Sequence, residues 1–131
     1  MKRLAIESKQ STEWIDVTDA VARAVAELER VPRAVLLFCP HTSAAVTINE
    51  GWDPAVAQDL DRALAALVPR IPYRHAEGNS PAHLLATLVG PSVHLAVDEE
   101  GRLQLGRWQR IFFCEFDGPR ERELWLQPLG D

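Results

Sequence analysis

The chain has 131 residues, of which 47% are hydrophobic and 25% charged, and its formal net charge is −5. This length and composition predict one globular domain, residues 1–131, that can bury a core without disulfides or metals as staples. The negative charge argues against a general nucleic-acid binder, and the longest apolar runs, such as 34–39, are too short to cross a bilayer, so neither nucleic acid nor a membrane is an expected partner.

The two cysteines, Cys39 and Cys114, lack CxxC spacing, and each lies in an apolar run. The first three residues lead directly into a strand-like segment, without the pattern of a signal peptide. We therefore expect a cytoplasmic protein whose thiols are reduced and buried.

The first elements expected are two short strands at 4–7 and 14–17, joined by a polar turn. Thr18 is the expected N-cap of a first helix, whose apolar residues repeat at helical spacing until Pro32 ends the pattern. The continuous apolar run 33–39 is too short for a helix and predicts a buried strand.

Alternating residues at 44–48 predict a further, paired strand. Asp53 is the expected N-cap of a second helix, which ends before Pro69. A third helix has Ser80 as its expected N-cap and Gly90 just beyond its end.

The last third of the chain is strand-like, with turns that are too short for parallel crossovers. Its predicted strands are 92–97, 102–105, 108–116 and 120–127. The sequence therefore predicts an α+β fold with largely antiparallel sheets in a sandwich-like arrangement, with about three helices packed on them. The run 111–116 is apolar on both faces, so this strand should be central and covered on both sides.

Three histidines fall at the ends of predicted elements, where functional sites usually lie. His41 follows a buried strand, His75 lies in a polar loop, and His83 occupies the first turn of the third helix. The positive end of that helix disfavours protonation of His83, and a neutral imidazole is what a metal ligand or a general base requires. The residues alone leave three readings open: a metal site, a metal-free catalytic or binding site, or structural histidines. His94, within a strand, is expected to be a packing or surface residue.

Glu115 lies on a predicted buried strand, so its carboxylate needs a partner. Gln109 on the same face or an arginine from a neighbouring strand can supply one. Arg120, after the turn 117–119, can bind a phosphate or carboxylate in a bidentate manner.

Five ordered motifs span Pro40 to Arg120, and together they cover much of the chain. They are PHTSA at 40–44, INExxDP at 48–54, YRHxEGNSxAH at 73–83, GRLxLGxWQ at 101–109 and ExDGPR at 115–120. This series resembles the secondary thiamine-phosphate synthase family, also called YjbQ-like. The chain departs from the family pattern at Leu85, where members often have a basic residue, and at Ala96, where they often have proline.

The resemblance implies a homotrimer with sites near the subunit boundaries. It implies that His41, His75 and His83 converge and can hold a divalent metal, with zinc expected. Catalytic roles are expected for His41, His83, Glu50 and Glu115. Substrate-binding roles are expected for Asn49, Asn79, Trp108, Gln109 and Arg120.

The first function expected from the resemblance is a transferase that couples a hydroxymethylpyrimidine diphosphate to a thiazole phosphate. Release of pyrophosphate calls for magnesium and cationic groups, which Arg74, Arg120 and the start of the third helix can assist. A second hypothesis is a metal-dependent hydrolase of a small metabolite, with Glu77 or Glu50 as the base. A third is a non-catalytic trimer that binds a small ligand.

Overall fold

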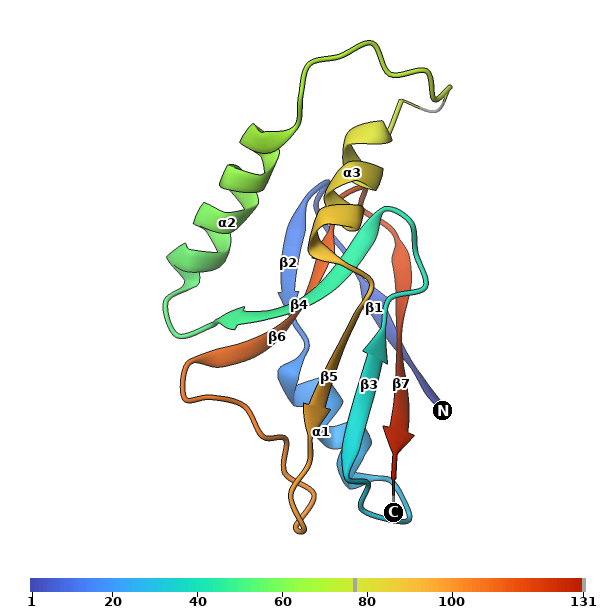
Figure 1. The fold of residues 1–131 in the computed structure, drawn as a ribbon, viewed down its shortest axis with the longest axis vertical. Helices are drawn as coiled ribbons and strands as arrows, with labels where there is room; N and C mark the ends of the chain where they lie inside the picture. The colour runs from blue at the N-terminus through green and yellow to red at the C-terminus, as the bar shows by residue number, and fades with distance from the viewer. Residues whose placement is uncertain (77, 131) are drawn as a thin grey trace.

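The computed structural model describes residues 1–76 and 78–130, and its strands form two antiparallel sheets (Figure 1). The first sheet has the order β1-β7-β3-β5, formed by Lys2–Glu7 (β1), Glu121–Leu129 (β7), Ala34–Phe38 (β3) and Ser92–Ala96 (β5). The second has the order β2-β6-β4, formed by Glu13–Asp16 (β2), Gln109–Glu115 (β6) and Ala44–Glu50 (β4). The helices are Thr18–Ala26 (α1), Pro54–Leu67 (α2) and Ser80–Val89 (α3). The predicted α+β sandwich-like class is confirmed.

β6 is the central strand of its sheet, and it is covered on both faces as predicted. Ile111 and Phe113 belong to the main core between the two sheets. Phe112 and Cys114 point the other way and belong to a second cluster that includes residues of α3. This division follows from the two-residue period of a strand, which sends successive side chains to opposite faces.

Two predicted N-caps are wrong by one residue. α1 is capped by Val17, and the Thr18 hydroxyl instead accepts a hydrogen bond of 2.7 Å from the backbone N–H of Ile111 in β6. α3 is capped by Asn79, with Ser80 as the first helical residue. In both cases the residue one position earlier takes the non-helical cap geometry, and neither Val17 nor Asn79 forms a side-chain cap hydrogen bond.

α2 begins as predicted, since the Asp53 side chain accepts a hydrogen bond of 2.9 Å from the backbone N–H of Ala55. No residue of α2 is buried, and the helix lies at the side of the second sheet (Figure 1). None of the helices in the described part of the chain combines the length and hydrophobicity that a membrane crossing needs.

The predicted strand at 102–105 does not form. An isolated bridge joins Val97 to Leu103, while the Arg102 side chain turns back to Asp98 at 2.9 Å. The Asp98 carboxylate also accepts the backbone N–H groups of Glu100 and Arg102, and this closes the turn in place of a sheet ladder.

Candidate histidine site

His83 has a defined tautomer. Its Nδ1 lies 2.9 Å from the backbone carbonyl oxygen of Thr42. Because a carbonyl oxygen only accepts hydrogen bonds, Nδ1 carries the proton in this contact. The lone pair of Nε2 is then free in the neutral imidazole, and this is the form that binds a metal or accepts a proton.

His75 lies beside His83. The centroids of the two rings are 5.2 Å apart, and the rings are inclined at 70°. His83 comes from the first turn of α3, whereas His75 comes from the exposed segment that precedes this helix. Two of the three predicted histidines therefore form a direct pair.

His41 shares a cavity with His83 but is held by different contacts. The two residues line a cavity of about 390 Å³ together with Thr42, Ala86 and other residues. The Nε2 of His41 accepts a hydrogen bond of 2.9 Å from the backbone N–H of Glu123 in β7.

Burial, followed by the charge of Arg122, lowers the pKa of His41 below its ordinary value of 6.5. The ring is therefore neutral at pH 7, with its proton on Nδ1. It presents an N–H donor, rather than a lone pair, to any ligand.

The histidines fit the predicted divalent metal in part. His75 and His83 have the right chemistry as neighbouring ligands, and a backbone carbonyl orients His83 in the manner usual for metal-bound histidines. His41 does not fit as a ligand in this orientation, because its Nε2 lone pair is already used by Glu123. Over residues 1–76 and 78–130, no group of three or more potential ligand side chains is arranged to hold a metal. Glu77, the predicted base, lies outside the described residues.

Asn79 and Arg120, both predicted to bind substrate, converge on Asp117 at the start of α3. Asn79 Nδ2 donates to Asp117 Oδ2 at 2.9 Å, and Arg120 Nη2 donates to the same oxygen at 3.0 Å. In the described part of the chain, the buried Oδ1 of Asn79 has no hydrogen-bond partner. The start of α3, the helix that bears His83, thus lies beside the Arg120 cation, the Asp117 carboxylate and the unpartnered oxygen of Asn79.

Glu115, predicted to be catalytic, is fully buried between the sheets. Its partner is Arg122 of the facing sheet, whose Nε lies 2.9 Å from Oε1 and whose Nη2 donates to Oε2. Ser8 and the backbone N–H of Asp117 complete its hydrogen bonds at 2.7 and 3.0 Å. Burial raises the pKa of the Glu115 carboxyl, but the hydrogen bonds from Arg122 and Ser8 outweigh this effect and the net shift is downward.

The Arg122 guanidinium also fixes the loop that carries His41. Its Nη2 donates to Ser43 Oγ at 2.8 Å and contacts the Ser43 carbonyl oxygen at 3.3 Å. The sequence predicts that an arginine from a neighbouring strand can pair with Glu115, but it does not single out Arg122. The missed signal is the alternation along β7, where Arg122 shares the inward face with Leu124 and Leu126.

The other predicted site residues lie on the β2-β6-β4 sheet, at the end opposite to Glu115. β4 and β6 pair from Ala44 with Glu115 to Glu50 with Gln109, which is a distance of about 20 Å along the strands. Asn49 accepts the backbone N–H of Glu50 at 2.8 Å.

Gln109 and Trp108 also make local contacts there. Gln109 Oε1 accepts the backbone N–H of Gly106 at 2.8 Å. The Trp108 ring packs on that of Trp52, with a centroid distance of 5.3 Å, and the guanidinium of Arg107 lies over it at 4.6 Å. Within one chain, the predicted site residues therefore lie in two separate groups.

Comparison with known proteins agrees with this architecture. Residues 2–131 match the family described as UPF0047 protein YjbQ-like. The UPF0047 protein YugU of Bacillus subtilis is 43% identical over 132 residues, covering 99% of each chain. A UPF0047 protein of Methanocaldococcus jannaschii is 39% identical, covering 96% of this chain and 91% of the relative.

Solved structures give the same result. A yjbq/upf0047-family protein from Clostridium acetobutylicum has a TM-score of 0.92 at 38% identity, covering 98% of this chain and all of that one. A conserved hypothetical protein from Thermus thermophilus has a TM-score of 0.89 at 44% identity, with the same coverage. The chain therefore belongs to the UPF0047 family of YjbQ-like proteins.

Proposed function

We propose that this protein is a transferase of the thiamine-phosphate synthase type, acting on small phosphorylated metabolites at a site built on His41, His75 and His83. The observation that carries the proposal is the fixed tautomer of His83, which leaves Nε2 with a free lone pair beside the His75 ring. A preorganised pair of imidazoles at the end of a helix is an arrangement suited to chemistry rather than to packing.

The start of α3 supports a phosphorylated substrate. A helix N-terminus attracts anions through its exposed N–H groups and its dipole. Arg120 lies there, and Arg74 precedes His75 in the same segment. In the proposed reaction a carbon–nitrogen bond forms to the thiazole nitrogen, while the carbon–oxygen bond to pyrophosphate breaks. The departing oxygens take up negative charge, which these cationic groups would stabilise.

We propose that the site is completed in a homotrimer. The two groups of predicted site residues are about 20 Å apart along one sheet, so a second copy is needed to bring one group to the other. The same contact can supply a third ligand for zinc beside His75 and His83, or ligands for magnesium if pyrophosphate is released. A resident metal would supply Lewis-acid stabilisation of the leaving group. Cytoplasmic location is part of the proposal, since both cysteines are free and buried.

The test is pyrophosphate release by the purified protein with hydroxymethylpyrimidine diphosphate and thiazole phosphate. Release should require both substrates, fall by at least about a hundredfold in His83→Ala, and persist in His94→Ala. His94 is an exposed histidine on β5 and so provides a matched control. Equal activity in the two variants, or no product above background in the native protein, would refute the transferase.

The free Nε2 of His83 also favours a second candidate, a metal-dependent hydrolase, because this atom can help to hold a metal that activates water. Metal analysis of the purified protein tests the hydrolase. Less than about 0.1 metal per chain would count against the hydrolase, because a resident site should be close to fully loaded. Thermal stabilisation by a metabolite without turnover would instead indicate the non-catalytic binding trimer.

A further inference from the structure

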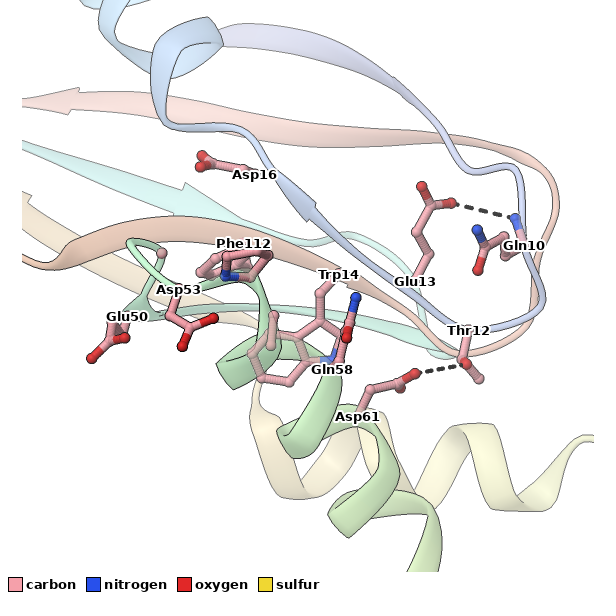
Figure 2. Close-up of a pocket in the computed structure, with 13 residues that line it drawn as sticks. Gln10, Thr12, Glu13, Trp14, Asp16, Glu50, Asp53, Gln58, Asp61 and Phe112 are labelled. Atoms are coloured by element: carbon pink, nitrogen blue, oxygen red, sulfur yellow. Dashed lines mark hydrogen bonds between the residues drawn. The ribbon is translucent and has the colours of Figure 1, made fainter.

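A second cavity, which shares no lining residue with the cavity of His41 and His83, lies between α2 and the outer face of the β2-β6-β4 sheet (Figure 2). Its volume is about 350 Å³. Thr12, just before β2, donates a hydrogen bond of 3.0 Å to Asp61 of α2, and this contact bridges the cavity's two walls. No residue of α2 is fully buried, and Ala57 and Leu64 are only partly buried where they pack against the cluster that includes Phe112.

The floor of this cavity is aromatic. Trp14 and Phe112 line it with their ring centroids 5.7 Å apart and their planes inclined at 53°. In the part of the chain that the structure describes, the buried Nε1 of Trp14 has no hydrogen-bond partner. This atom has almost no accessible surface, so it does not face the cavity, and what Trp14 offers a ligand is the face of its ring.

The walls carry one sign of charge. Five carboxylates line the cavity and no lysine or arginine does, within the residues described; the five are Glu13, Asp16, Glu50, Asp53 and Asp61. Arg110 neutralises Asp16 at 2.7 Å. Over residues 1–76 and 78–130, the other four form no ion pair. An aromatic floor below uncompensated carboxylates is the arrangement that recognises an organic cation.

We propose that this cavity binds a small organic ammonium ion that has an apolar or aromatic body. The body packs on the rings of Trp14 and Phe112, and the ammonium group faces the carboxylates. The aromatic floor and Asp61 are on β2, β6 and α2, so the cavity does not include the histidine pair of the proposed function, although it borders the second group of predicted site residues at Glu50.

Tyramine is a suitable probe because it has an aromatic ring and an ammonium group. Two related compounds serve as controls: 4-ethylphenol has no ammonium group, and 3-(4-hydroxyphenyl)propionate has a carboxylate in its place. Isothermal titration of the full chain should show tyramine binding about tenfold tighter than 4-ethylphenol, and no binding of the propionate. Tyramine binding no tighter than 4-ethylphenol, or undetectable at about 10 mM, would overturn the proposal.

Substitutions then localise the site. Asp61→Asn and Glu13→Gln keep their hydrogen-bond acceptors and lose charge, so each should weaken tyramine about threefold to fivefold while leaving 4-ethylphenol unchanged. Trp14→Phe should weaken both probes. The matched control is Glu29→Gln, an exposed carboxylate outside the cavity, and it should have no effect.

If Glu29→Gln and Asp61→Asn weaken tyramine binding equally, the effect comes from the overall charge of the protein, and the proposed site is overturned. Trp14→Phe need not fold for this test to be decisive, because the Asp61 and Glu29 variants keep the aromatic floor. His83→Ala should leave tyramine binding unchanged, so failure of the transferase and failure of this site can be told apart.

Discussion

Replacing Arg122 with methionine should be one of the most destabilising single substitutions in the chain. The Arg122 side chain is 4% exposed and that of Glu115 is not exposed at all. Without the guanidinium, the Glu115 carboxylate keeps only the hydrogen bonds from Ser8 and the backbone of Asp117. Breaking a buried ion pair in this way costs about 3–5 kcal/mol, which is a large share of the total stability of about 5–15 kcal/mol expected for a domain.

The magnitude can be checked by a double-mutant cycle. In Glu115→Gln/Arg122→Met, the amide oxygen still accepts from Ser8 and no buried charge remains. This double variant should therefore be more stable than Arg122→Met alone by about 2 kcal/mol, which is a strong departure from additivity. The measurement is urea unfolding at pH 7, followed by circular dichroism.

The control is Arg120→Met. Arg120 pairs with Asp117 at 3.0 Å but is 50% exposed, so its loss should cost no more than about 1 kcal/mol. If Arg122→Met and Arg120→Met reduce the free energy of unfolding equally, or if the effects of Glu115→Gln and Arg122→Met simply add, the reasoning about the buried pair is wrong.

Three further predictions concern other parts of the scaffold. The pKa of His41 is lowered below 6.5 in the folded protein, so its contribution to stability is present above pH 6.5 and is lost as the pH falls below that value. Thermal melts between pH 5 and 7 should therefore show a melting temperature that falls with decreasing pH, and this dependence should be weaker in His41→Asn. The same pH dependence in both proteins would contradict the prediction. Gly118→Ala brings a Cβ against the Gln10 carbonyl and within 2.7 Å of Ser8 Oγ. The substitution should therefore lower the free energy of unfolding in urea by about 1–3 kcal/mol. An unchanged unfolding midpoint would show that this turn can relax. Asp53→Ala should destabilise the protein by about 1 kcal/mol and Asp53→Asn by much less, because asparagine retains the cap of α2. Equal losses of stability in the two variants would argue against capping.

The sequence predicts the fold well where the hydrophobic pattern within one segment is enough to define the element. The run 111–116 has no polar face, which is enough to predict a central strand. It could not predict which sheet each strand joins. The strands at 4–7 and 14–17 are close neighbours in the chain, yet β1 pairs with β7 and β2 pairs with β6. Pairing depends on which apolar faces meet across the core, and this is a property of the whole chain.

The caps of α1 and α3 show a related limit. Thr18 and Ser80 are good N-cap residues by type, but residue type does not say which other group competes for the side chain. The Thr18 hydroxyl accepts from Ile111, which is 93 positions away. For the site, their positions at the ends of predicted elements and the family resemblance indicated His75 and His83, which do form a pair. The other predicted group, around Gln109, lies at the far end of the sheet because register cannot be read from motifs.

The loop before β4 connects the buried ion pair to the histidine site. Its three successive residues are held by separate contacts: His41 by a backbone N–H of β7, Thr42 by Nδ1 of His83, and Ser43 by Arg122. The carbonyl that fixes the tautomer of His83 is therefore set between two anchored neighbours. A site argued from the lone pair of His83 thus depends on a contact between the two sheets, because any shift of Ser43 moves the Thr42 carbonyl. Variants that probe the chemistry should accordingly be made on α3 itself, since replacing Arg122 changes the loop and the fold together.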